Sequence, residues 1–95
     1  MDQAADHNLI LAKAIAHFGE EKQITKAIEE MAELIKALVD PRSTPEQVAD
    51  EIADNLIMIA QLSMIYGDGT VMDRMEYKLN RLAKKIAAET AGELC

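Results

Sequence analysis

The 95-residue sequence is poor in aromatic residues, which make up 3% of the chain, with one Phe, two Tyr and no Trp. A core of stacked rings is therefore excluded, and the 49% of hydrophobic residues must build an aliphatic core. Only two prolines occur, and this shortage favours long helices. At this length we expect one domain over residues 1–95, with an ordered core at about residues 4–88.

Other shortages bear on compartment and partners. The only cysteine is Cys95, so no intrachain disulfide is possible, and a reducing cytoplasm is expected. No apolar run reaches about 18 residues, and the N-terminus lacks the pattern of a signal peptide, so we expect no membrane partner. Lys and Arg number 10 against 17 Asp and Glu, a net charge of −7. This balance argues against the basic surface that a nucleic-acid partner would need.

The hydrophobic periodicity predicts an all-α fold of four helices, at about residues 4–18, 21–39, 45–66 and 71–88. Gly19 follows the first helix as a C′ residue. Thr44 and Gln47 form a capping box at the start of the third. The segment 67–69 breaks the chain before the fourth helix, which Thr70 and Asp73 are expected to cap, and the tail 89–95 is expected to fray.

Two pairs of carboxylates share one spacing: Glu30 with Glu33 on the second helix, and Glu51 with Asp54 on the third. Residues three apart lie on one face of a helix, about one turn apart. In an antiparallel hairpin, Glu33 and Glu51 lie equally far from the connection 40–44, and so do Glu30 and Asp54. The sequence therefore predicts that four carboxylates converge at matched heights.

The apolar positions of the second helix alternate four and three apart, and we call them the aliphatic seam: Ile24, Ile28, Met31, Ile35 and Leu38. Glu30 and Glu33 lie away from this seam, so one chain alone is expected to leave them exposed. On the third helix, the stripe of Glu51 and Asp54 continues into residues expected to be buried: Met58, Gln61 and Ile65. Only a homo-oligomer, a dimer or a dimer-of-dimers tetramer, would bury both faces.

The donor set of the four carboxylates is all oxygen, which suits Mg²⁺, Mn²⁺ or Ca²⁺ rather than zinc. His7 and His17 do not share a helical face and are interpreted as ordinary helix residues. No Glu-x-x-His pair occurs, so a di-iron site is not expected. Mg²⁺ held by carboxylates completes its shell with water and substrate phosphates, which indicates phosphoryl or pyrophosphoryl hydrolysis.

The double motif Glu-Glu-x-x-Glu, a 17-residue spacer, then Glu-x-x-Asp resembles the signature of the MazG-like all-α nucleoside triphosphate pyrophosphohydrolases. The runs KQITKAIEEMAELIKAL and DEIADNLIMIAQLSMIYG are similar to the small single-domain, phage- or cassette-type members. The resemblance covers roughly residues 23–85. It implies a four-helix subunit that assembles into helical bundles, and hydrolysis of an NTP or dNTP between the α- and β-phosphates. The expected products are a nucleoside monophosphate and pyrophosphate, in nucleotide house-cleaning or dNTP control.

The resemblance also implies roles for single residues. The Mg²⁺ ligands would be Glu30, Glu33, Glu51 and Asp54, with Mn²⁺ as a substitute, and Glu29 would be an outer ligand or the base that orients the attacking water. Basic residues would contact the triphosphate: Lys26, Lys78 and Arg81. Lys26 has an equally plain interpretation as an ion pair with Glu30, and Lys78 and Arg81 as surface residues of a basic helix.

Three questions stay open at the level of sequence. The base pocket is unassigned, with Phe18 and Tyr66 as weak candidates, and Asn55 fits either a base contact or a core hydrogen bond. A phosphoribosyl-ATP pyrophosphohydrolase would use the same fold and metal chemistry. A non-catalytic helical interaction module, with the aliphatic seam binding a partner, is the alternative from another functional class.

Overall fold

The computed structural model describes residues 3–94, which form four helices and no strand. They are α1 (Gln3–Phe18), α2 (Glu20–Val39), α3 (Pro45–Tyr66) and α4 (Asp68–Leu94). The predicted all-α class is thus confirmed. None of the helices in this part of the chain is long and apolar enough to cross a membrane. The chain divides into two compact units, residues 1–65 and residues 66–95, which are described separately below.

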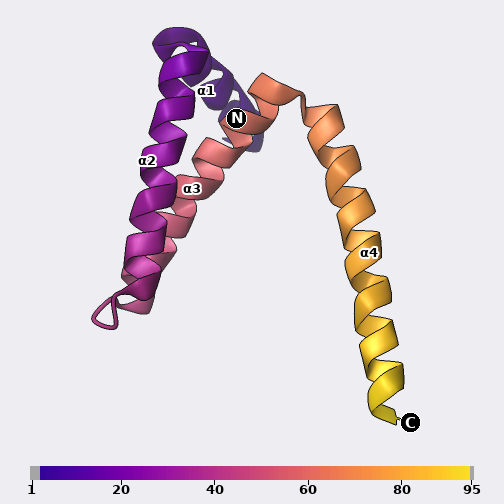
Figure 1. Cartoon of the computed structure of the whole chain (residues 1–95). Coiled ribbons are helices and arrows are strands. Elements are labelled where there is room, and N and C mark those ends of the chain that lie inside the picture. Colours follow the sequence, from indigo (N-terminus) through magenta and orange to yellow (C-terminus); the bar gives the residue numbers. More distant parts are fainter. Residues whose placement is uncertain (1–2, 95) are drawn as a thin grey trace. The chain divides into compact units, whose positions relative to one another are not determined.

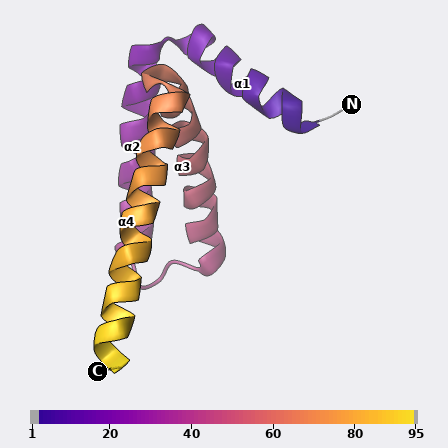
Figure 2. The ribbon, with the colours of Figure 1, turned by 90° about the vertical axis from the view of Figure 1, so that its right-hand side faces the viewer.

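The first unit is built on a hairpin, in which α2 and α3 run side by side in opposite directions (Figures 1 and 2). Gly19 separates α1 from α2 with a φ of 94°, a left-handed conformation that glycine adopts without strain. Its N–H donates to Ile15 O at 2.8 Å, and its carbonyl accepts from Gln23 N at 3.1 Å. One glycine therefore ends α1, as predicted, and also begins α2.

The predicted capping box begins α3. Gln47 N donates to Thr44 Oγ1 at 3.1 Å, and Thr44 N donates to Gln47 Oε1 at 2.9 Å. This reciprocal pair satisfies backbone donors that the first turn of a helix leaves free. At the other end of the connection, Asp40 Oδ1 accepts from Arg42 N at 2.9 Å and from Arg42 Nε at 3.1 Å. Both ends of the hairpin connection are thus fixed by local hydrogen bonds.

The interior of the first unit is small and largely polar. Ala27 and Met58 are the only buried hydrophobic side chains among the described residues, and three polar side chains are buried with them: Gln23, Asn55 and Gln61. On α2, the face turned toward α3 carries Gln23, Ala27, Glu30 and Leu34, and we call it the site-bearing face. The aliphatic seam lies about 100° around the same helix. Except for half-buried Ile24 it is exposed, with Ile28 and Ile35 each 62% accessible.

One expectation about this packing is wrong. The sequence indicated that a single chain would leave both Glu30 and Glu33 exposed, yet the side chain of Glu30 is only 16% accessible. The hairpin buries the face of α2 that has small and polar residues: Ala27 is 1% accessible, and Gln23 and the Glu30 carbonyl oxygen are hydrogen-bonded to α3. Glu33, beside this face, is exposed as expected.

The second unit is dominated by α4, which is longer than predicted. It begins at Asp68 rather than residue 71, so Thr70 and Asp73 lie inside the helix and do not cap it. Gly67 alone makes the break, with a φ of 108°, and its carbonyl accepts from Val71 N at 3.0 Å. Gly69 fits within the first turn. The tail is helical to Leu94, against the expectation of fraying from residue 89, and Cys95 lies outside the described residues.

Candidate metal centre

The hairpin brings three of the four predicted carboxylates together. Oxygen atoms of Glu30, Glu51 and Asp54 all lie within 4.8 Å of one another, and we call these residues the carboxylate cluster. Glu30 comes from α2, while Glu51 and Asp54 come from adjacent turns of α3. Glu30 and Glu51 are half-buried, whereas Asp54 is exposed. The cluster thus has two partly buried members and one exposed member.

Glu33 lies outside this cluster but close enough to act on it. Glu33 and Glu51 line one concave surface, near the hairpin connection, together with Lys36 and Asp40. Glu30 and Asp54 line a second one, one turn further along. Each concave surface thus contains one of the two pairs that the sequence predicts at matched heights in the hairpin. Glu51 links the two surfaces, because its carboxylate also belongs to the cluster with Glu30 and Asp54.

The electrostatics of Glu51 reflect this crowding. Desolvation by burial raises the pKa of the Glu51 carboxyl, and the negative charges of Asp54, Glu33 and Glu30 raise it further. The fold therefore places several carboxylates close to Glu51, and binding of a proton or a cation there would reduce their mutual repulsion. A raised pKa next to converging carboxylates is a common property of functional sites.

Lys26 supplies a positive charge beside the cluster. Its Nζ lies 3.2 Å from Glu30 Oε1, one turn along α2, and its side chain is 53% accessible. The hydrogen bond to Glu30 and the charge of that carboxylate raise the pKa of Lys26. The ion-pair interpretation of Lys26 therefore describes the structure as it stands. With about half of its surface accessible, the Lys26 side chain can also be reached from solvent.

Asn55 holds the two helices at the level of the cluster, a role that the sequence left open. Its Nδ2 donates to Glu30 O at 2.9 Å and to Glu51 O at 2.8 Å, and the side chain is 4% accessible. Both amide hydrogens are thus used on the backbone of two cluster residues. The signal in the sequence was its position, directly after Asp54 on a buried stripe of α3.

The cluster fits a hard divalent cation. Opposite ligand oxygens of an octahedral Mg²⁺ site lie about 4.2 Å apart, twice the usual Mg–O distance, and those of a Ca²⁺ site lie about 5 Å apart. The oxygens of the cluster lie within 4.8 Å of one another, so their separations are of the order that such a site needs. The group contains no His or Cys, so the donor set is the oxygen set that Mg²⁺, Mn²⁺ and Ca²⁺ prefer.

The remaining predicted site residues lie elsewhere. Glu29 is exposed on α2 and lines a cavity with Lys26, outside the cluster. Lys78 and Arg81 are exposed residues of α4 in the second unit, and their contact with a triphosphate stays a prediction. Phe18 lines the same cavity as Glu29, whereas Tyr66 belongs to the second unit.

Comparison with known protein families, with functionally described proteins and with solved structures finds no match. The functional assignment of this chain therefore rests on its own residues and on the motif that they form.

Proposed function

We propose that this protein is a MazG-like, Mg²⁺-dependent nucleoside triphosphate pyrophosphohydrolase. It would cleave an NTP or dNTP between the α- and β-phosphates, releasing a nucleoside monophosphate and pyrophosphate. The observation that carries the proposal is the carboxylate cluster, with its oxygens within 4.8 Å of one another on two helices that meet through buried polar contacts. Three carboxylates this close repel one another, and a bound divalent cation would offset that repulsion more fully than the single ammonium group of Lys26.

The residues of the chain divide the work. Glu30, Glu51 and Asp54 hold the cation, and Glu33 joins them from the neighbouring turn of α2. When bound, Mg²⁺ would supply positive charge to the phosphates and would make a water molecule a stronger nucleophile. Glu29, on the exposed side of α2, accepts the proton of the attacking water or orients it. These assignments explain why both helices carry the same spacing of acids.

Basic residues act on the polyphosphate. Lys26, which pairs with Glu30 at 3.2 Å, would donate from its ammonium group to a phosphate oxygen of the substrate. Lys78 and Arg81 add positive charge along the rest of the triphosphate. The net charge of −7 is consistent with this division, because an acidic surface repels a free triphosphate more than its metal complex.

The proposed enzyme is a cytoplasmic homo-oligomer, a dimer or a dimer of dimers. Among the residues whose burial the structure describes, two buried hydrophobic side chains are few for a stable single copy, since stability arises mainly from apolar burial. The aliphatic seam exposes Ile28, Ile35 and Leu38 at 61–62% each. A second copy packing on this seam would complete the core with the four-three spacing that helical bundles use.

The test is product analysis with a panel of substrates. The protein with Mg²⁺ is incubated with each common NTP and dNTP and with phosphoribosyl-ATP, and the nucleotide products and pyrophosphate are separated and quantified. Equal release of monophosphate and pyrophosphate from nucleoside triphosphates supports the proposal. Cleavage of phosphoribosyl-ATP alone would instead identify the protein as a phosphoribosyl-ATP pyrophosphohydrolase. Release of neither product, with no response to metal, would favour the interaction module.

A further inference from the structure

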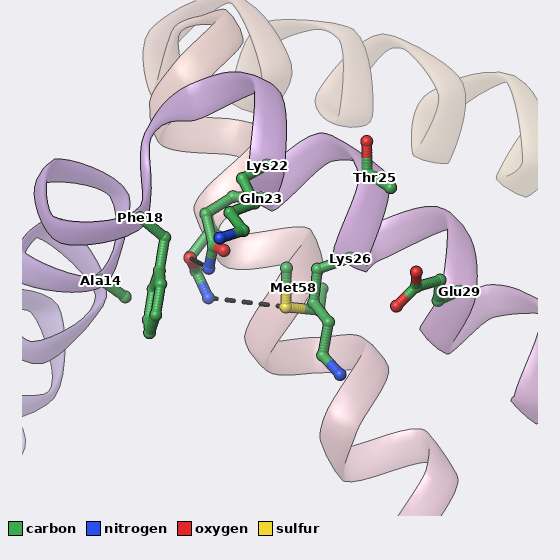
Figure 3. Close-up of a pocket in the computed structure, with 9 residues that line it drawn as sticks. Ala14, Phe18, Lys22, Gln23, Thr25, Lys26, Glu29 and Met58 are labelled. Carbon is green, nitrogen blue, oxygen red and sulfur yellow. Dashed lines mark hydrogen bonds between the residues drawn. The ribbon is translucent and has the colours of Figure 1, made fainter.

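Two glutamine side chains are buried between α2 and α3, at the end of the hairpin away from the connection 40–44. Gln23 is 7% accessible and Gln61 is 3% accessible, and Gln23 Nε2 donates to Gln61 Oε1 at 2.7 Å. Both line one cavity with Met58, and Figure 3 shows Gln23 extending from α2 and Met58 from α3 at this level. We call the two glutamines the amide pair.

The amide pair lies at a matched height on the two helices. Gln23 precedes Glu30 by seven residues on α2, and Gln61 follows Asp54 by seven residues on α3. Seven residues are two turns of helix, or about 10 Å along its axis. Because the connection 40–44 lies on the other side of the carboxylate cluster, the cluster is placed between the connection and the amide pair.

Asn55 joins the helices at the level of the cluster itself, where its Nδ2 donates to Glu30 O at 2.9 Å. A contact at one height leaves the angle between two helices undetermined, since they can pivot about it. The amide pair is a second buried contact, two turns away, and it restricts this pivoting. Together the two contacts determine how α2 lies against α3 around the cluster.

Apolar packing contributes less to this arrangement. Among the described residues, the buried hydrophobic side chains are Ala27 and Met58. Apolar contacts tolerate a shift of one helix along another, whereas a buried amide that loses its partner costs free energy. A buried polar residue can fix the register of packed helices for this reason. In this hairpin a shift of about one turn would bring Glu33 rather than Glu30 to the level of Asp54.

We propose that Gln23 and Gln61 are positioning residues, whose hydrogen bond fixes how α2 lies against α3 and thereby sets the spacing of the carboxylate oxygens for Mg²⁺. The inference rests on the proposed function, since it concerns the shape of the same metal centre. Accurate spacing matters most for Mg²⁺, which requires nearly ideal octahedral geometry, whereas Ca²⁺ accepts flexible geometry at longer distances. Loss of the amide pair should therefore weaken Mg²⁺ binding more than Ca²⁺ binding.

The test compares the affinities of the two cations. Mg²⁺ and Ca²⁺ are titrated calorimetrically, without nucleotide, into the wild-type protein and into the double variant Gln23→Met/Gln61→Met. Methionine is close to glutamine in length and leaves no amide unpaired, so urea unfolding should show a stability no lower than that of wild type. We expect Mg²⁺ affinity to fall at least about tenfold and Ca²⁺ affinity by less than about threefold. An unchanged ratio of the two affinities overturns the inference.

Two further variants separate the hydrogen bond from packing. Gln61→Glu keeps the side-chain length and an oxygen that accepts from Gln23 Nε2, so the ratio of Mg²⁺ to Ca²⁺ affinity should stay as in wild type. Met58→Leu changes the buried apolar contact beside the amide pair and should also keep the ratio. A ratio that falls in Met58→Leu as far as in the double variant contradicts the inference.

The remaining outcomes also decide. If the double variant does not fold, Gln61→Met is compared with Gln61→Glu, and equal ratios in these two single variants overturn the inference. If the wild-type protein binds neither cation, the proposed function fails, and this inference fails with it. If the wild-type protein binds Mg²⁺ and the double variant keeps the wild-type ratio, this inference alone fails and the proposed function stands.

Discussion

On α2 the polar face is buried and the apolar face is exposed, which is the opposite of the usual arrangement in a soluble protein. The site-bearing face has Gln23, Ala27 and Glu30 and is buried against α3, while the aliphatic seam, with Ile28 and Ile35, is accessible. Burying apolar surface is the main source of stability, so an exposed apolar face beside a buried polar one is what the proposed oligomer would explain. The comparison is the basis for proposing separate tasks for the two faces, a reaction site within the chain and a core shared between chains.

The largest expected effect concerns the site-bearing side of the hairpin. Asp54→Asn keeps the shape of the side chain but removes one charge of the carboxylate cluster, and we expect pyrophosphohydrolase activity to fall at least about 100-fold. The fold should persist, because Asp54 is exposed. Steady-state rates at saturating Mg²⁺ measure the loss. Glu46→Gln, an exposed acid in the first turn of α3, is the matched control, and equal rates for both variants would remove Asp54 from the site.

The next effect concerns the aliphatic seam. Ile35→Asp places a charge where a second copy is expected to pack, and burial of one isoleucine stabilises by about 1.5–3 kcal/mol. Because a symmetric interface contains the change twice, we expect the dissociation constant of the oligomer to rise at least about 100-fold. Sedimentation equilibrium measures it. Ile35→Leu keeps volume and polarity and should associate normally. An unchanged assembly in Ile35→Asp would show that this seam has another use.

A smaller effect is expected where Asn55 joins the faces of α2 and α3. Asn55→Ala removes two hydrogen bonds to backbone carbonyls and should lower the free energy of unfolding by about 1–3 kcal/mol. Mg²⁺ affinity should also fall, by about tenfold or more, because the Asn55 side chain no longer hydrogen-bonds to the backbone carbonyl groups of Glu30 and Glu51. Urea unfolding and metal titration measure the two effects. Asn80→Ala, at an exposed position of α4, is the control. If it lowered stability and Mg²⁺ affinity as much as Asn55→Ala does, Asn55 would have no special role in holding the cluster.

The smallest effect is a pH dependence of the protein without divalent cations. The pKa of Glu51 is raised in the folded chain by burial and by Asp54 and Glu33, so the folded state holds this proton more tightly than the unfolded state. Stability should therefore fall as pH rises from the usual range of a glutamate through the raised pKa. Glu51→Gln removes this fall and should melt at a higher temperature than wild type at neutral pH in EDTA.

The control for this effect is the same pair of proteins at low pH, where Glu51 is protonated in both states and the difference should vanish. Glu46→Gln should show no such gain at neutral pH. If the wild-type protein became more stable as pH rose over this interval, the conclusion that neighbouring carboxylates raise the pKa of Glu51 would be wrong.

Local patterns in the sequence predicted much of this structure. The bounds of α3 and its capping box follow from Thr44, Pro45 and Gln47, because these signals act within one turn. The equal spacing of acids on two helices placed Glu30 near Glu51 and Asp54, since a hairpin connection fixes relative height. Gly19 ended α1 for the same local reason.

The packing of the helices against one another could not be predicted from local patterns in this way. Periodicity identifies the most apolar face of α2, but which face packs within the chain depends on Ala27 and on the amide pair of Gln23 and Gln61, which bond across 38 positions. The start of α4 was misplaced because two glycines flank Asp68, and only the φ of Gly67 shows which one breaks the helix. The bridging role of Asn55 likewise needs both helices in place.

The claim that unites these features is that the carboxylate cluster binds a divalent cation. Calorimetric titration of Mg²⁺ into the wild-type protein and into Asp54→Asn, in the absence of nucleotide, tests it most directly. We expect saturable binding to wild type and a loss of most of that affinity in Asp54→Asn. Binding of equal affinity in both proteins, or no binding to either, would contradict the account.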